Sequence, residues 1–303
     1  MDEANSETSH VAQVAIWFLF ITSILVGAAR LGTRYAMTST LAWDDRIMIL
    51  SMVAYLSQCI AASEMASNGL GQSLSSLSEV SIDQFLKAGY ANIPLLILTL
   101  ALVKWSNLAF IKQLSTRTFD HRTNFGLGLL VGLWFLSGII VSLFQSPMPS
   151  PWAYNNDDGS IDRRAWWTFL SVMNMLTDVG IIATYCSLMA RLQISLIKRG
   201  ILFGIFLTRI LVIVATGGQL AAFWVAYGDP DISRSERVPV ICNQAVVCLS
   251  VISSCLPYLR PFMESLQSGV GRIENIGSED ELADSRPTPQ SNTYCMNGLA
   301  DNF

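Results

Sequence analysis

Seven apolar runs of about twenty residues constrain this chain more than any other feature of its sequence. At about 1.5 Å of rise per residue, a helix of that length crosses the ~30 Å hydrocarbon core of a bilayer. The runs are Val11–Ala29, Ile47–Ala66, Ala88–Ile111, Phe125–Phe144, Trp166–Ala190, Ile201–Trp224 and Val238–Leu259. The sequence therefore predicts an all-α fold, a seven-transmembrane-helix bundle in a multi-pass membrane protein.

The composition agrees with a membrane location. Of the 303 residues, 51% are hydrophobic and 14% are charged, whereas soluble domains carry about 25% charged residues. This deficit excludes a soluble enzyme. The net charge is −4 and no basic cluster is present, which excludes a nucleic-acid partner. The lipid bilayer is the expected partner, and protein partners are not indicated.

Basic residues favour an N-terminus on the outer or lumenal side, because Lys and Arg are retained in cytoplasmic loops. In that orientation the inner segments carry twelve basic residues, more than twice as many as the outer loops. Residues 1–10 then form a short outer segment, residues 11–265 the seven-helix domain, and residues 266–303 a disordered cytoplasmic tail. The tail is predicted from its Ser, Gly, Glu and Asp content, which buries too little apolar surface to offset ordering entropy. The endoplasmic reticulum and the plasma membrane are not distinguished.

The sequence predicts neither a cofactor nor a metal site. His10 and His121 lie outside the apolar runs, and the cysteines have no metal-ligand spacing. No phosphate loop, G-x-S-x-G elbow or dinucleotide fingerprint is present. Any catalysis would depend on carboxyl, amide or aromatic groups.

Four ionisable residues lie inside the apolar runs, where each needs a partner, a cavity or a function. Their depths along the helices place Lys104, Asp178 and Arg209 close enough to form a buried ionic cluster. Such a cluster is either a structural link between three helices or the floor of a site. The fourth, Glu64, is expected to be buried away from basic groups.

A polar pocket is predicted in the outer half of the bundle. Amide side chains at similar height would form its wall, with Asp178 at its floor; they belong to Asn174, Gln219, Asn243 and Gln244. Tryptophans near the same interface form either an aromatic belt or a ligand cage; they are Trp152, Trp166, Trp167 and Trp224. A small lipophilic metabolite is the ligand that such a pocket would suit.

Proton-initiated cyclisation of a lipophilic substrate is a chemistry that needs no cofactor. A carboxylic acid moves the proton, while apolar walls and aromatic faces stabilise the developing cation. Glu64 is the predicted acid because burial raises the pKa of a carboxyl group, and Asp178 is the second candidate catalytic residue. Alternatively, Glu64 reaches interfacial water and takes no part.

Several short motifs, taken in order, carry a family resemblance. They are Arg30-Leu-Gly-Thr-Arg34, Asp44-Asp45, Gly69-Leu-Gly71, Lys104-Trp-Ser106, Pro149-Ser-Pro151-Trp152, Asp178 and Cys255-Leu-Pro-Tyr-Leu-Arg-Pro261. Together they resemble the fungal rhodopsin-domain family from about residue 11 to 265. Two features depart from its pattern: Gln145-Ser146 stands where a cysteine is usual, and Val179–Met189 lacks the expected proline.

The resemblance implies a fungal integral membrane protein, in a family that includes candidate receptors and members encoded in mycotoxin gene clusters. The last apolar run contains no lysine, so a retinal Schiff base is excluded. The predicted function is a part in secondary-metabolite biosynthesis, as a cofactor-free cyclase or as a pathway membrane component. A ligand-sensing receptor resembling G-protein-coupled receptors is the main alternative. A metabolite exporter is disfavoured because the two halves show no internal repeat.

Overall fold

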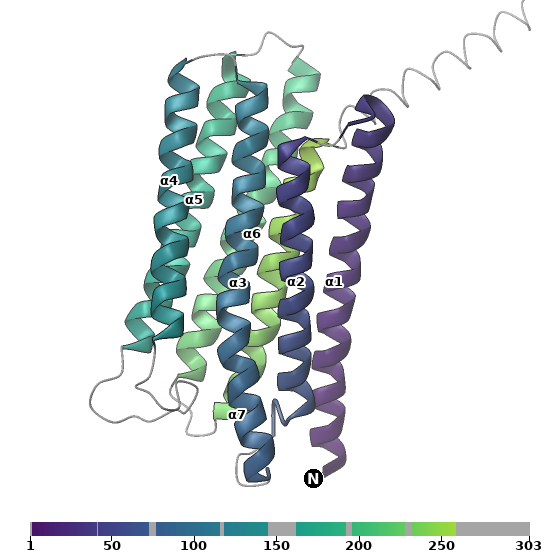
Figure 1. Ribbon diagram of the computed structural model, residues 1–303, viewed down its shortest axis with the longest axis vertical. Helices are drawn as coiled ribbons and strands as arrows, with labels where there is room; N and C mark the ends of the chain where they lie inside the picture. The colour runs from purple at the N-terminus through teal and green to yellow at the C-terminus, as the bar shows by residue number, and fades with distance from the viewer. Residues whose placement is uncertain are drawn as a thin grey trace, which may run out of the picture. The chain divides into compact units, whose positions relative to one another are not determined.

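The part of the chain that the structure describes is all-helical. The computed structural model describes residues 2–40, 42–72, 77–115, 118–144, 162–191, 196–227 and 232–258. Within these ranges helices are joined by turns and bends, and no strand is present. Seven of the helices are long and apolar enough to span a membrane (Figure 1). The predicted seven-helix membrane fold is confirmed.

The helices extend beyond the predicted apolar runs. In chain order they are α1 (Asp2–Thr38), α2 (Trp43–Ser67), α3 (Glu79–Leu114), α4 (Thr118–Leu143), α5 (Arg163–Arg191), α6 (Leu196–Ala226), the short α7 (Ile232–Ser235) and the last helix (Arg237–Tyr258). Helix α3, for example, has 36 residues and spans about 54 Å, more than the ~30 Å hydrocarbon core. Hydropathy detects only the middle of such a helix.

Three predictions concern chain segments rather than spans. Because α1 begins at Asp2, residues 2–10 continue the first helix and no boundary is seen at residue 10. The predicted tail, residues 266–303, lies outside the described residues, as do Trp152 and Gln145-Ser146. The side of the membrane on which the N-terminus lies stays a prediction.

Large apolar side chains face outward and polar side chains face inward, as expected in a lipid bilayer. On α2, Val53, Leu56 and Ile60 follow one exposed stripe, whereas Ser51 and Gln58 are fully buried. The polar residues that interrupt the second apolar run therefore point into the bundle. This arrangement supports the insertion of α2 as a membrane span.

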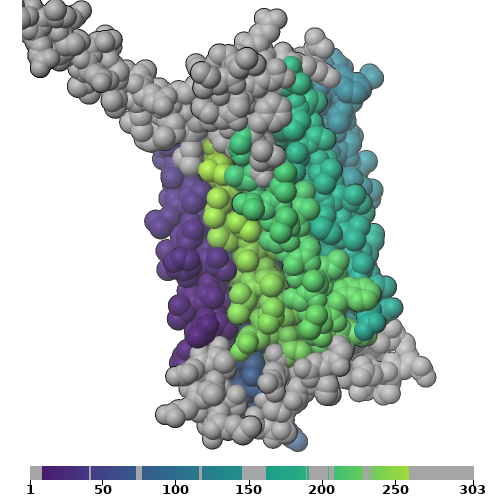
Figure 2. Space-filling view, turned by 180° about the vertical axis from the view of Figure 1, so that it is seen from behind, coloured from purple at the N-terminus to yellow at the C-terminus, as the bar shows by residue number. Residues whose placement is uncertain are grey.

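The last helix occupies a central place in the bundle. On the face shown in Figure 2 it lies between α1 and α6. Its side chains Val246, Val247 and Val251 are fully buried. Residues of this helix take part in the clusters and cavities described below.

Candidate functional site

Lys104, Asp178 and Arg209, termed here the Asp178 cluster, meet between α3, α5 and α6. Lys104 Nζ and Arg209 Nη1 each lie 2.9 Å from Asp178 Oδ1. The three residues are almost completely buried. These distances agree with the helix depths that were estimated from the sequence.

Lys104 also binds the backbone of α5. Its ammonium group donates to the Asn174 carbonyl oxygen at 2.9 Å and to Thr177 Oγ1 at 2.8 Å. Asp178 Oδ2 has no hydrogen-bond partner among the described residues. Two cations share one carboxylate oxygen, so the cluster is an ionic link between three helices.

Substituting Asp178 tests this link. We expect Asp178→Asn to destabilise the protein by about 3 kcal/mol, because it leaves buried cations uncompensated. This destabilisation is at the lower end of the range for a broken buried ion pair, because Lys104 keeps two hydrogen-bond acceptors on α5. Adding Lys104→Met should restore part of it. Thermal unfolding in detergent measures the stability of both variants. An Asp178→Asn protein as stable as the wild type would contradict the role of Asp178 as an ionic link.

A second buried ionic group, termed here the Arg30 cluster, lies where α1, α2, α3 and the last helix meet. It consists of Arg30, Arg34, Asp44, Asp45, Ser106, Gln113 and Tyr258. Arg30 and Arg34 both lie 3.0 Å from Asp44 Oδ2. Arg30 also lies over the Tyr258 ring, 3.7 Å from its centroid.

This group was not predicted, because Arg30 and Arg34 follow the first apolar run and so stood among the basic residues of the inner segments. Arg30 is in fact fully buried. A signal was present, since two arginines end the first apolar run and two aspartates open the next. Opposite charges on both sides of a short turn predict pairing. Four of the seven motifs that carry the family resemblance thus contribute residues to this network, namely those that contain Arg30, Asp44, Ser106 and Tyr258.

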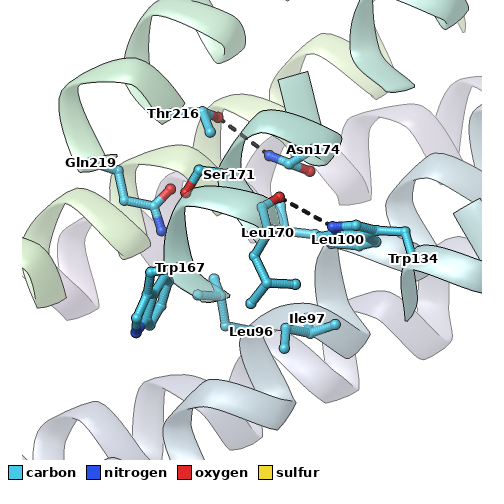
Figure 3. Close-up of a pocket in the computed structure, with 10 residues that line it drawn as sticks. All are labelled: Leu96, Ile97, Leu100, Trp134, Trp167, Leu170, Ser171, Asn174, Thr216 and Gln219. Carbon is cyan, nitrogen blue, oxygen red and sulfur yellow. Dashed lines mark hydrogen bonds between the residues drawn. The ribbon is translucent and has the colours of Figure 1, made fainter. Parts of the chain in front are cut away.

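A small cavity, termed here the Trp134 cavity, lies among α3, α4, α5 and α6. Its residues are Leu96, Ile97, Leu100, Trp134, Trp167, Leu170, Ser171, Asn174, Thr216 and Gln219. Figure 3 shows the polar side chains Ser171, Asn174 and Gln219 on one side and the apolar Leu96 and Ile97 on the other. It offers about 20 Å³, room for one ordered water.

A second cavity, termed here the Glu236 cavity, offers about 40 Å³. Its lining includes Phe85 and Asn92 of α3, Arg163 of α5, and Glu236 and Asn243 near the start of the last helix. Arg163 Nη2 lies 3.6 Å from Glu236 Oε1. Burial raises the pKa of the Glu236 carboxyl group, and the Arg163 guanidinium opposes this effect.

Trp167 is common to the two cavities, because it lines both. Gln219 of the first cavity donates to Asn243 of the second, which joins their polar walls. Three buried atoms of the lining residues have no hydrogen-bond partner among the described residues: Asn92 Oδ1, Asn174 Oδ1 and Trp167 Nε1. We refer to the two cavities together as the Trp167 chamber.

The chamber contains three of the four predicted pocket amides. Asn174, Gln219 and Asn243 line it. Gln244 does not, because its side chain accepts a long contact from Cys59 Sγ of α2 at 3.6 Å. Trp166 and Trp167 are buried in the bundle, so neither belongs to an aromatic belt.

Glu64 is not placed as the acid prediction requires. Its side chain is exposed, and it continues the outward stripe of Val53, Leu56 and Ile60. Asn68 Nδ2 lies 3.5 Å from Glu64 Oε2, and Glu64 lines neither cavity. The expected burial of Glu64 is therefore wrong. Glu236 was not among the predicted site residues, because Glu236 lies outside the apolar runs.

The comparison with protein families agrees with the motifs. The model of the fungal rhodopsin domain matches residues 29–265, which include both ionic clusters and both cavities. No curated protein matches the chain. The Arg30 cluster brings four of the distant motifs together, since residues of each make contacts within it. On its sequence match and its seven-helix fold, the chain belongs to the fungal rhodopsin domain family.

Proposed function

We propose that this protein takes part in fungal secondary metabolism by binding a lipophilic, oxygenated intermediate in the Trp167 chamber. The unpartnered atoms of Asn92, Asn174 and Trp167 carry the proposal, because each is at least nine-tenths buried and lines the chamber. Buried polar groups without a partner are costly. The two amide oxygens suit ligand hydroxyl groups, and the indole N–H suits a carbonyl or hydroxyl oxygen.

The body of the ligand should be apolar. Leucine, isoleucine and aromatic side chains make up much of both cavities. Ligand pockets usually measure about 300–1,000 Å³, whereas the two cavities offer about 20 and about 40 Å³, so lining side chains must move apart to admit a metabolite. Trp167 lines both cavities, so displacing its side chain would enlarge the space of each.

Catalysis in this chamber would use Glu236. Its carboxyl group lines the chamber near Phe85 and Trp167, whose ring faces suit a developing cation. The acid donates a proton to an oxygen or double bond of the substrate, and its carboxylate takes a proton back from the product cation. Such an isomerisation balances without an oxidant or cofactor. Asp178 lines neither cavity, so we assign it to the ionic link instead.

A substitution that fills the Trp134 cavity tests the binding site. Ser171→Leu adds bulk inside the Trp134 cavity, and we expect it to weaken binding about tenfold, because overpacking costs ~1–3 kcal/mol. Val172→Leu adds bulk on the outer face of the same helix and should bind normally. The ligand is the intermediate that accumulates when the gene is deleted, measured by mass spectrometry on protein in nanodiscs. Equal retention by both variants would exclude the chamber.

A ligand-sensing receptor is the second candidate, and one contact favours it. The Asn174 side chain lines the chamber, while its carbonyl oxygen accepts from Lys104 of the Asp178 cluster. A ligand that moves Asn174 would therefore shift an ionic link between helices, and the coupling would act in both directions. Gene deletion separates the candidates: a receptor loses a response, and no intermediate accumulates.

A further inference from the structure

A groove between α3 and α4 lies outside the Trp167 chamber. It offers about 600 Å³, and its lining includes Trp105 and Lys112 of α3 and His121, Asn124, Phe125 and Gly128 of α4. Phe125 is 75% exposed. Because outward faces of membrane helices meet acyl chains, the groove opens towards lipid.

Polar character is confined to one end of the groove. Lys112 lies near the end of α3, which ends at Leu114. His121 lies in the first turns of α4, which begins at Thr118. Trp105, Phe125 and the Gly128 backbone form the rest. A cation and an imidazole donor at the helix ends, above an apolar trough, match a phospholipid headgroup above its acyl chain.

Asn124 gives a second, independent observation. It is 7% exposed and lines the groove. Its Nδ2 donates to the Leu108 carbonyl oxygen at 3.0 Å, which fixes the amide, but Oδ1 has no partner among the described residues. An acceptor left unpaired at membrane depth is costly. A headgroup ammonium or hydroxyl would satisfy it.

We propose that the α3–α4 groove binds an anionic phospholipid whose headgroup also carries a hydrogen-bond donor. The phosphate contacts Lys112 and His121, the headgroup donor binds Asn124 Oδ1, and one acyl chain lies along Trp105 and Gly128. Phosphatidylserine meets these requirements through its net charge and its ammonium group. Phosphatidylcholine has neither a net charge nor an N–H or O–H donor in its headgroup.

Native mass spectrometry of the full chain tests the site with defined lipids. The protein is purified into micelles that contain equal amounts of phosphatidylserine and phosphatidylcholine, and the retained lipid is counted. We expect about a fivefold preference for phosphatidylserine, the effect of one basic residue at a membrane surface. Lys112→Gln combined with His121→Gln should remove that preference. Lys112 is exposed and His121 only partly buried, so this variant is expected to fold.

A matched pair of glycine variants locates the site. Gly128→Leu fills the groove beside Leu108, and it should abolish retention of phosphatidylserine. Gly126→Leu adds the same side chain where no atom lies within 4 Å, and it should retain the lipid. Thermal unfolding confirms that each variant is folded.

Three results would overturn the proposal. One is an unchanged preference for phosphatidylserine in the Lys112 and His121 variant, because the basic end would then have no role. Another is equal retention of phosphatidylserine and phosphatidylcholine by the wild type. The third is retention of phosphatidylserine by a folded Gly128→Leu protein. Equal retention would mean that the groove does not select an anionic lipid, and retention by Gly128→Leu would place the bound lipid elsewhere on the protein.

Discussion

Asp44→Asn is expected to lower the free energy of unfolding by about 5 kcal/mol, the upper end for loss of a buried ionic partner. Asn keeps the size of the side chain and some of its hydrogen bonds, so the change isolates the charge. Asp44 Oδ2 accepts from both Arg30 and Arg34, and Oδ1 accepts from Gln113 at 2.6 Å. Removing one negative charge leaves two arginines to share Asp45.

Thermal unfolding of purified protein measures this effect. For a bundle of this size we expect the midpoint to fall by about 10–20 °C. Asp83→Asn is the matched control, because Asp83 forms an exposed pair with Lys87 at 2.7 Å. Exposed pairs contribute less than about 1 kcal/mol. An unchanged midpoint for Asp44→Asn would mean that Asp45 alone balances both arginines.

Glu236→Gln is expected to reduce turnover of the pathway intermediate by ~10²–10⁴-fold while binding and folding persist. Gln keeps the shape and hydrogen bonding of the side chain but has no proton to transfer. Glu64→Gln is the matched control, since Glu64 is an exposed carboxyl outside both cavities. Microsomes that carry each variant, supplied with the intermediate and no cofactor, give the rates.

The pH dependence of the activity distinguishes a general acid from a residue that has only a structural role. A general acid is active when protonated, and burial raises the pKa of the Glu236 carboxyl group. Activity should therefore fall as the pH rises through that raised pKa, which lies above the ordinary value for a glutamate. Equal conversion by the two Gln variants would exclude Glu236 as the acid. No conversion by the wild type would favour the receptor.

Depth along a membrane helix could be predicted from sequence, because every residue adds the same rise. That regularity located the seven spans, and it also placed Lys104, Asp178 and Arg209 within reach of one another. The ends of the helices could not be predicted in this way. At the start of α3, Ser78 Oγ accepts from the Ser81 N–H, a cap that hydropathy does not detect.

Rotation about the helix axis was harder to predict, and Glu64 shows why. The apolar run of α2 contains small and large apolar residues on all sides, so hydropathy alone did not identify its inner face. The buried positions Ser51, Gln58 and Met65 recur every seven residues and mark that face. Glu64 precedes Met65 by one position, which turns it about 100° towards lipid. Reading the polar residues as the inner face would have corrected the prediction.

The position of the Arg30 cluster in the chain has a consequence for biogenesis. Arg30 and Arg34 lie near the end of α1, and Asp44 follows Arg30 by 14 residues, at the start of α2. Two positive and two negative charges therefore emerge from the ribosome close together, and they cancel as soon as α2 is made. Tyr258 joins 214 residues after Asp44. We expect α1 and α2 to enter the bilayer as a hairpin whose buried charges are already paired, to which the last helix adds the Tyr258 phenol and the Ser254 carbonyl oxygen.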